Sequence, residues 1–277
     1  MTADELIGLE IELLLEGVFQ VYGYDFRGYA EASLRRRLAQ WLSGSGYATL
    51  SLAQSDLLRD RTLFDTLLRG ITVNVSEMFR DPGFFTAIRE QVVPYLKTYP
   101  FVKIWHAGCA TGEEAYSMAI LLQEEGLKGR FRIYATDINE EVIHKAEEGI
   151  YPLLNMQHFT RNYQHSGGTG SFSDYYTARY NHAILSPSLR EHIVFAAHNL
   201  AVDTDFGEMN LILCRNVMIY FKQALKERVF ALFDTSLIPG GFLCLGTKEN
   251  LEFRHISDRY EALTPRMQIY RKRYAKK

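Results

Sequence analysis

The segment from Ile104 to Glu114 constrains the fold of this chain more than any other. It reads Ile-Trp-His-Ala-Gly-Cys-Ala-Thr-Gly-Glu-Glu, an apolar run that breaks into small residues and continues into a helical pattern. This order predicts a strand, a tight turn and the start of a helix. Gly108 lies in the turn, where the absence of a side chain lets the backbone come close to a ligand.

Two carboxylates at the predicted helix start, Glu113 and Glu114, narrow the class of ligand. They would repel a pyrophosphate where phosphate-binding turns present bare N–H groups, which disfavours dinucleotides and nucleoside triphosphates. A positively charged nucleoside without phosphates fits better, and S-adenosylmethionine carries both a sulfonium and a free amine. The alternative is an ordinary strand–helix turn whose two acids stabilise the first helical turn.

A further carboxylate, Asp137, ends the next β-rich run, Arg132–Asn139, and a helical stretch Glu140–Gly149 follows it. At the tip of the second strand of a doubly wound sheet, a carboxylate can accept hydrogen bonds from two ribose hydroxyls. Alternatively, Asp137 or Asn139 caps the following helix. Together the two segments predict a βαβ unit that binds an adenosine-type ligand.

Two later apolar runs, Ile193–Leu200 and Met209–Phe221, complete the predicted sheet. Ligands of open α/β sheets bind at the carboxyl ends of strands, so polar residues released there are candidate site residues. They are Asn199, Arg215, Asn216 and Tyr220. Beyond them we expect a helix over Lys222–Leu237, a turn at Pro239–Gly241, and a hairpin-like pair of strands, Phe242–Gly246 and Met267–Arg271.

The N-terminal part has a different pattern, which predicts a small helical domain over residues 1–70. Apolar spacing there indicates four short helices, Asp4–Phe19, Tyr29–Leu42, Leu50–Leu58 and Leu63–Leu68. Arg35, Arg36 and Arg37 form the densest basic cluster, which is either a solvated helix face or a docking surface for an acidic helical partner.

Residues 71–100 are expected to form a linker and a leading helix, Pro82–Leu96, before an α/β domain over residues 101–277. The linker is either a plain connection or a ligand contact, because Asn74, Ser76 and Arg80 are spaced so that they could face one ligand. Residues 152–191 interrupt the sheet pattern. They predict an insertion with a flexible turn at 165–170, or a surface excursion that covers the sheet edge.

Composition limits the other possibilities. A net charge of −2 argues against general nucleic-acid affinity. The chain has no apolar run of about 18 residues and no leader pattern, so we expect a cytoplasmic protein without membrane insertion. Cys109, Cys214 and Cys244 lack metal-ligand spacing and are expected to be buried and reduced. The histidines are scattered, so no metal site is expected.

Several motifs resemble the CheR family, bacterial chemoreceptor glutamate methyltransferases that use S-adenosylmethionine. They are Asn74-x-Ser76-x-x-Phe79-Arg80, the Thr-Gly-Glu-Glu-x-Tyr-Ser turn, Ala135-Thr-Asp137-Ile, His198-Asn199-Leu200, and Cys214-Arg215-Asn216-Val-Met-Ile-Tyr220-Phe221. The resemblance spans nearly the whole chain. It implies a Rossmann-like, doubly wound methyltransferase sheet with an N-terminal helical domain and an inserted antiparallel β subdomain.

The resemblance also implies roles for individual residues. Asn74, Ser76 and Arg80 would contact the cofactor, Glu113 or Glu114 would approach its amine, and Asp137 would bind the ribose. Asn199, Leu200, Arg215 and Asn216 would surround the adenosine and sulfonium. Tyr220 would lie near the transferred methyl, so Tyr220 and Arg80 are the candidate catalytic residues. The product would be S-adenosylhomocysteine.

Two departures from the family pattern stand out. Ser76 replaces a common threonine but keeps the hydroxyl, and Tyr95-Leu-Lys97-Thr occupies the region where reference members carry an arginine. The absence of a general-base constellation agrees with the chemistry, because a glutamate with a pKa near 4.3 is already ionised at neutral pH.

The implied partner is the cytoplasmic domain of a methyl-accepting chemotaxis receptor. In some members the β subdomain also binds a receptor C-terminal peptide by strand addition. Two other functions are considered. One is methylation of a different substrate, against which the arginine-rich helical domain argues if that substrate is small. The other is a non-catalytic module that senses the cofactor.

Overall fold

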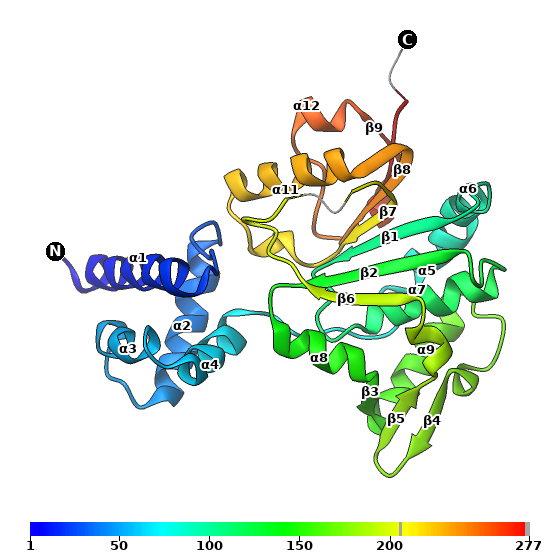
Figure 1. Ribbon diagram of the computed structural model, residues 1–277. Coiled ribbons are helices and arrows are strands. Elements are labelled where there is room, and N and C mark those ends of the chain that lie inside the picture. The colour runs from blue at the N-terminus through cyan, green and yellow to red at the C-terminus, as the bar shows by residue number, and fades with distance from the viewer. Residues whose placement is uncertain (205–206, 275–277) are drawn as a thin grey trace. The chain divides into compact units, whose positions relative to one another are not determined.

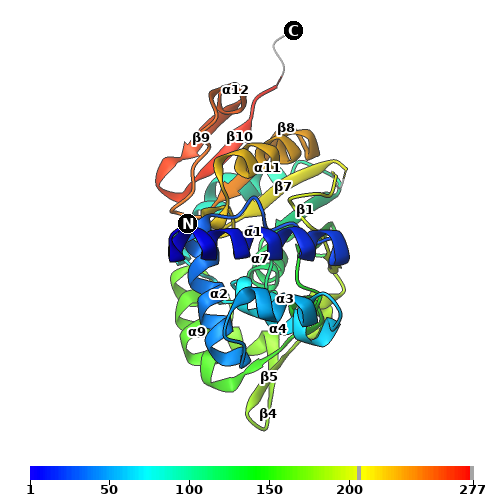
Figure 2. The ribbon, with the colours of Figure 1, turned by 90° about the vertical axis from the view of Figure 1, so that its left-hand side faces the viewer.

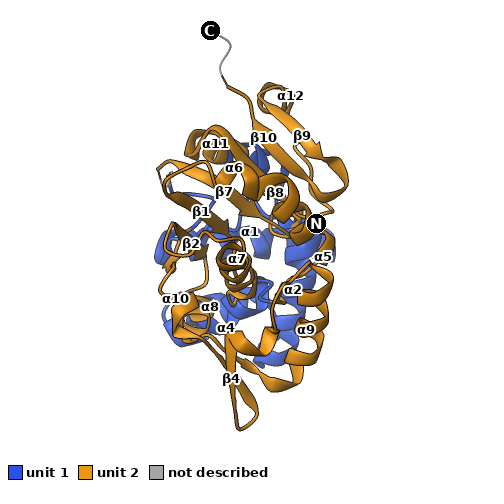
Figure 3. Cartoon of the chain, turned by 90° about the vertical axis from the view of Figure 1, so that its right-hand side faces the viewer, with its two compact units in different colours: residues 1–74, 199–203, 220–229 blue, residues 75–198, 204–219, 230–277 orange. Residues whose placement is uncertain are grey.

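The computed structural model describes residues 1–204 and 207–274 and divides the chain into two compact units (Figure 3). The first unit consists of residues 1–74, 199–203 and 220–229, and the second contains the remaining described residues. The last three residues of the predicted α/β domain, 275–277, lie outside the described residues, as do residues 205–206.

The first unit is built on the four predicted helices. They are α1 (Ala3–Tyr22), α2 (Glu31–Ser45), α3 (Leu50–Leu57) and α4 (Arg61–Ile71) (Figures 1 and 2). Local signals set their ends. Thr2 and Glu5 form a reciprocal capping box at the start of α1. The Asp60 carboxylate accepts hydrogen bonds from the first N–H groups of α4.

Two segments from much later in the chain pack with these helices. The N–H of Ala30 donates to the carbonyl of Tyr220 at 2.7 Å, and the N–H of Lys222 donates to the carbonyl of Gly28 at 2.7 Å. Leu225 packs so closely that a Cβ on Gly28 would meet its side chain at 2.9 Å. The first half of α11 (Gln223–Ser236) therefore belongs to the helical unit.

The second unit contains a seven-stranded sheet in the order β6-β2-β1-β7-β8-β10-β9 (Figure 1). Pairing is parallel from β6 to β8 and antiparallel from β8 to β9. The strands are β1 (Val102–Ala107), β2 (Phe131–Asp137), β6 (Ile193–Ala197), β7 (Met209–Cys214), β8 (Leu237–Leu245), β9 (Tyr260–Thr264) and β10 (Ile269–Lys272).

This strand order confirms the predicted doubly wound fold. The chain proceeds from β1 to β2 and β6 on one side, then returns to β7 and β8 on the other. The winding direction reverses between β1 and β7, and this switch point is where open α/β sheets bind ligands. The helices of this unit are α5 (Pro82–Ala87), α6 (Val93–Leu96), α7 (Glu113–Glu124), α8 (Glu140–Glu148), α9 (Met156–His165), α10 (Pro187–Arg190) and α12 (Arg254–Ser257).

The core of this unit follows the alternation of β1. Ile104 belongs to the large apolar cluster that includes α7, while Trp105 points to the other face and packs against Phe233, with ring centres 5.3 Å apart. Cys109, Cys214 and Cys244 are buried and unpaired, as predicted. In the described parts of both units, none of the helices combines the length and the apolar character that a membrane span needs.

One local prediction is wrong, and two are refined. The expected turn at Pro239–Gly241 lies inside β8, which absorbs the extra residues as an irregularity in its pairing with β7. The run that begins at Met209 leaves the sheet at Cys214, so Arg215 and Asn216 follow a strand end as expected. The leading helix spans the expected Pro82–Leu96, but a π-helical turn, Ile88–Val92, interrupts it shortly before Pro94, which has no N–H to continue the α-helical pattern.

A three-stranded antiparallel sheet confirms the predicted β insertion. It has the order β3-β5-β4, formed by β3 (Ile150–Pro152), β5 (His182–Leu185) and β4 (Tyr176–Arg179). The 165–170 turn was expected to be flexible, but hydrogen bonds hold it in place. The N–H of Gly170 donates to the hydroxyl of Tyr163 at 2.8 Å. A Cβ on Gly168 would fall 2.3 Å from the ring of the same tyrosine.

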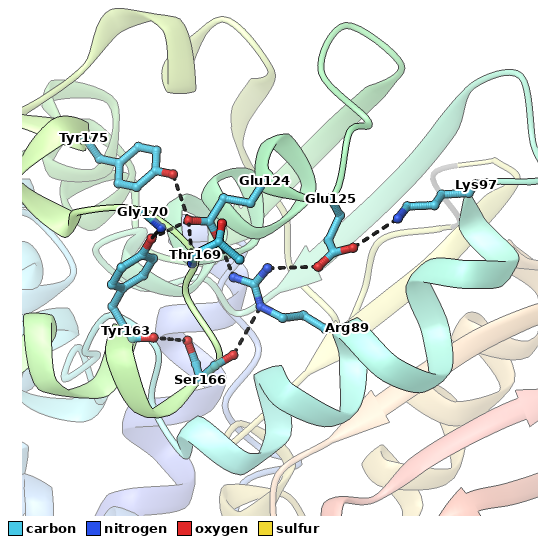
Figure 4. Close-up of polar contacts among 9 residues, drawn as sticks. All are labelled: Arg89, Lys97, Glu124, Glu125, Tyr163, Ser166, Thr169, Gly170 and Tyr175. Atoms are coloured by element: carbon cyan, nitrogen blue, oxygen red, sulfur yellow. Dashed lines mark hydrogen bonds and ion pairs between the residues drawn. The ribbon is translucent and has the colours of Figure 1, made fainter.

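A buried ionic cluster joins this insertion to α7 and to the π-helical turn Ile88–Val92 (Figure 4). We call it the Arg89 clamp, and its members are Arg89, Glu124, Tyr163, Ser166 and Tyr175. The Arg89 guanidinium pairs with Glu124 and donates to the carbonyl of Ser166 at 3.1 Å. The hydroxyls of Tyr163 and Tyr175 both donate to Glu124 Oε1. One carboxylate at the end of α7 thus holds three separate segments.

Candidate functional site

The turn after β1 requires glycine for steric reasons that the structure makes explicit. Gly108 and Gly112 have φ of +78° and +88°. A Cβ on Gly108 would lie 2.4 Å from the side chain of Val217, and one on Gly112 would lie 2.8 Å from Cβ of Ala146. Ala110 also adopts a positive φ of 48°. The predicted strand, turn and helix start are confirmed, and the two glycines leave room for Val217 and for Ala146 of α8.

Asp137 lies at the end of β2 and stabilises this turn directly. Its Oδ2 accepts a hydrogen bond from the N–H of Ala110 at 2.9 Å, and its Oδ1 accepts one from Asn139 at 3.1 Å. Burial raises the pKa of Asp137 above its usual range. Asn139, rather than Asp137, caps α8, because its side chain accepts from the N–H of Glu141. Of the two residues that could cap this helix, Asp137 therefore keeps its carboxylate for the turn.

The two acids at the start of α7 have different surroundings. Glu113 accepts hydrogen bonds from the Thr111 hydroxyl at 2.7 and 2.9 Å, and burial raises the pKa of its carboxyl despite the hydroxyls of Thr111 and Ser76. Glu114 pairs with Arg215. Burial opposes ionisation of Glu114, but the charge of Arg215 and the neighbouring His106 ring lower its pKa to about 2. Glu114 is therefore ionised at neutral pH.

Arg215 is held between two carboxylates directly after β7. It pairs with Glu114 and donates to Asp81 Oδ2 at 2.7 Å, and its guanidinium lies 4.0 Å from the ring centre of Phe84. Its side chain is almost fully buried. This network connects the carboxyl end of β7, the start of α7 and the residue that precedes α5.

Arg80 lies in a strained stretch of backbone. Phe79 and Asp81, on either side of it, have φ of +53° and +57°, which is rare for residues other than glycine. The N–H of Phe79 donates to the Ser117 hydroxyl at 2.9 Å, which fixes this stretch to α7. The described residues give the Arg80 guanidinium no hydrogen bond or ion pair, so it is available for a ligand. Local strain of this kind is concentrated at functional sites.

Sequence reasoning missed Glu249, which shapes the backbone after Arg215. Its carboxylate accepts hydrogen bonds from five backbone N–H groups at distances from 2.7 to 3.2 Å. The donors are Asn216, Val217, Met218, Ile219 and Gly246. Asn216 has φ of +62° and is kept in that conformation by this contact. The sequence gives no signal for Glu249 except a single acid after the last parallel strand.

The predicted site residues divide between the two units. Ser76, Arg80, Gly108, Glu113, Glu114, Asp137, Arg215 and Asn216 belong to the second unit. Asn74, Asn199, Leu200 and Tyr220 belong to the first. In that unit the Asn199 side chain accepts from the N–H of Ala201 at 3.0 Å. Asn74 donates to the Thr72 hydroxyl at 3.1 Å.

The three arginines of α2 do not form one uniform surface. Arg35 pairs with Asp4 and with Glu31. Arg36 is exposed. Arg37 places its guanidinium 5.4 Å from the ring centre of Tyr220, a contact within the first unit. Arg36 and Arg37 therefore remain available for docking, while Arg35 is paired with acids of the same unit.

Comparison with known proteins identifies relatives over nearly the full length. Residues 74–267 match the family described as CheR methyltransferase, SAM binding domain, and residues 9–72 match CheR methyltransferase, all-alpha domain. A Pseudomonas putida protein, provisionally named methyltransferase Cher3, is 48% identical to this chain. The match covers 98% of this chain and 100% of that protein.

Two relatives carry the name chemotaxis protein methyltransferase. The Listeria monocytogenes protein is 29% identical and the match covers 83% of this chain and 85% of that protein. The Escherichia coli protein is 31% identical, with 71% and 67% covered.

The second unit fits S-adenosylmethionine at the switch point of its sheet. After its two backbone contacts, Asp137 keeps lone pairs on both carboxylate oxygens for two ribose hydroxyls. Glu114, which is ionised and paired with Arg215, adds a carboxylate whose charge is complementary to an ammonium group. A phosphate-bearing ligand would meet three carboxylates here, Glu113, Glu114 and Asp137, which agrees with the exclusion made from the sequence.

Proposed function

This chain belongs to the CheR methyltransferase family, and from that premise we propose that it methylates glutamate side chains on the cytoplasmic signalling helices of chemoreceptors. S-adenosylmethionine is its cofactor and methyl transfer its activity, in keeping with the family domain over residues 74–267. A chemotaxis protein as the substrate is supported by the two relatives named chemotaxis protein methyltransferase, and the glutamate side chain is the finer part of the proposal.

One contact within the first unit carries the proposal furthest. Arg37 lies against the ring of Tyr220, and Arg36 is exposed one residue before it on α2. A cationic helix face therefore adjoins the tyrosine that would lie near the transferred methyl. Such a face is complementary to an acidic receptor helix and would guide it to the reacting position.

We assign the remaining roles by charge. Asp137 binds the ribose, and Glu114 takes the amine because it stays ionised and its side chain is more exposed than that of the buried Glu113. Arg215 and Asn216 border the adenosine and sulfonium, together with Asn199 and Leu200. Arg80, with its free guanidinium, and the linker residues Asn74 and Ser76 contact the cofactor.

The reaction needs alignment more than proton transfer. The cofactor supplies the methyl group, and the substrate carboxylate is already ionised at neutral pH. The residues of this chain therefore orient the carboxylate, exclude water and hold the cofactor. Correct orientation of two reactants can lower a barrier by roughly 7–11 kcal/mol. Tyr220 would orient the incoming carboxylate through its hydroxyl.

A receptor C-terminal peptide is a second contact that we propose for the β insertion. β4 (Tyr176–Arg179) is an edge strand of the small sheet, and its residues are largely exposed. An extended peptide could pair with this edge by strand addition.

The test incubates the protein with tritiated S-adenosylmethionine and membranes that contain chemoreceptors. We expect base-labile label in the receptor band, and less label with Arg36→Glu/Arg37→Glu although cofactor affinity is unchanged. Arg59→Glu, which reverses the charge of an exposed arginine two residues after α3, is the control. Label that enters other proteins but no receptor would refute the substrate and leave the methyltransferase assignment intact.

A further inference from the structure

The first helix of the chain has an apolar stripe on the side that faces away from its own core. Ile11, Leu14, Leu15 and Val18 of α1 are buried. Leu6, Leu9 and Leu13 are 45%, 43% and 52% exposed. Spacings of three and four residues place these three leucines along one line of the helix, opposite the buried positions. A surface helix of a small domain ordinarily carries polar residues there.

Helix α3 packs against α1 beside the stripe. The N–H of Ser51 donates to Glu10 Oε1 at 3.3 Å, and the Gln54 side chain donates to the carbonyl of Leu13 at 3.2 Å. Figure 2 shows α1 along its length, with α3 and α4 below it. We call Leu6, Leu9 and Leu13 the α1 stripe.

Acids follow one edge of the α1 stripe. At 100° per residue, Glu5, Glu12 and Glu16 fall along the same side of the three leucines. Glu16 pairs with Arg27, whereas the described residues give Glu12 no hydrogen bond or ion pair. Residues 1–25 contain six acids and no lysine or arginine. The charged residues that α1 itself places beside the stripe are therefore all acids, and Arg27 pairs with one of them, Glu16.

This charge selects among possible occupants. Two copies of α1 packed through the stripe would bring the same acids together, and like charges at such an interface are unfavourable. An anionic lipid surface attracts amphipathic helices that carry basic residues. The acids beside the α1 stripe would therefore repel such a surface. We propose that the α1 stripe is a docking site for a protein helix whose apolar face is flanked by lysine or arginine. This site is separate from the basic face of α2 and does not depend on the proposed receptor substrate.

The test uses a designed helical peptide of about five turns as the probe, with a leucine stripe flanked by lysines. Its binding to the full chain is measured by fluorescence anisotropy. We expect the lysine peptide to bind at least about tenfold more tightly than the same peptide with glutamates in place of the lysines. Raising the ionic strength from ~0.1 to ~1 M, which shortens the screening length from about 10 to about 3 Å, should reduce that difference.

Variants locate the contact. Leu9→Gln/Leu13→Gln changes only exposed side chains to a residue of similar helix propensity. It should weaken binding of the lysine peptide at least about tenfold. Leu154→Gln, a change at an apolar residue that is 89% exposed in the other unit, should have no effect and is the matched control. Equal binding of the two peptides, or equal binding to both variants, would overturn the proposal.

Two further measurements test the excluded occupants. Light scattering that shows dimers lost in Leu9→Gln/Leu13→Gln would make the stripe a self-interface and overturn the proposal. If the wild-type chain binds phosphatidylglycerol vesicles and the same variant does not, the occupant of the stripe is a lipid surface and the proposal is overturned. A monomer that ignores the vesicles and binds the lysine peptide supports it.

Discussion

Breaking the Arg89 clamp should cost more stability than any exposed ion pair of the protein. The side chains of Arg89 and Glu124 are only 8% and 4% exposed. Replacing Arg89 with methionine keeps most of the side-chain volume but leaves the Glu124 carboxylate buried without its cation. Loss of one member of a buried pair costs about 3–5 kcal/mol. Because Tyr163 and Tyr175 still donate to Glu124, we expect about 3 kcal/mol, the lower end of that range.

A double-mutant cycle separates the pair from its surroundings. Glu124→Gln removes the negative charge, while Arg89 keeps its contact with Glu125 at 3.1 Å. In Arg89→Met/Glu124→Gln neither charge is left without its partner, so the double variant should lose less stability than the sum of the single changes, by at least about 1 kcal/mol. Lys97→Met is the matched control, because Lys97 pairs with Glu125 at the exposed end of the same cluster. It should cost no more than about 1 kcal/mol.

The free energy of unfolding is measured by urea titration, and amide hydrogen exchange reports the local effect. Exchange should accelerate first at Thr169 and Gly170, whose N–H groups donate to Glu124 and to Tyr163. If Arg89→Met costs no more than Lys97→Met, or if the cycle is additive, the clamp does not hold the insertion as described.

Four further predictions concern the site. Asp137→Ala should weaken S-adenosylmethionine binding by about 1.5–3 kcal/mol, measured by calorimetry, and unchanged affinity in a folded protein would refute the ribose contact. Since burial raises the pKa of Asp137, wild-type affinity should fall on acidification before the protein unfolds. A raised carboxyl pKa favours the folded state at low pH, so Asp137 itself does not promote acid unfolding. Tyr220→Phe should lower turnover about tenfold with little change in cofactor affinity. If Tyr220→Phe leaves turnover unchanged while Tyr220→Ala lowers cofactor affinity, the ring only packs against the cofactor. Glu249→Gln should lower cofactor affinity, because Arg215 and Asn216 would be displaced. Glu252→Gln, at an exposed residue nearby in the chain, should leave that affinity unchanged. Equal affinities of these last two variants would contradict that role.

The sequence allowed prediction of the parts of the site where chemistry and local pattern coincide. The turn from Gly108 to Glu114 and the strand tip at Asp137 could be located because small residues and acids interrupt apolar runs there. Glu249 could not be found, because its partners are backbone N–H groups that leave no trace in side-chain type. The Arg89 clamp was missed for a related reason, since Glu124 contacts residues that are at least 35 positions away in the chain.

The fold was predictable where a pattern persists over several turns or strands. The expected turn at Pro239–Gly241 was wrong because β8 pairs with β7 on both sides of these residues, at Leu237 and again from Phe242, so they form an irregularity within the strand rather than a turn that ends it. The grouping of residues 220–229 with the N-terminal helices was also not visible. It depends on Leu225 fitting against Gly28, a contact between parts of the chain that no local pattern connects.

The composition of the helical unit has a consequence for synthesis on the ribosome. Its first 74 residues are made early, but the unit also needs residues 199–203 and 220–229. At about 5–20 residues per second, the last of these segments is made roughly 10–30 s after residue 74. During that interval Gly28 and Ala30 lack the backbone partners that Lys222 and Tyr220 later provide. These helices are therefore made before the later segments that complete their fold, and a chaperone that binds nascent chains would find its substrate in residues 1–74.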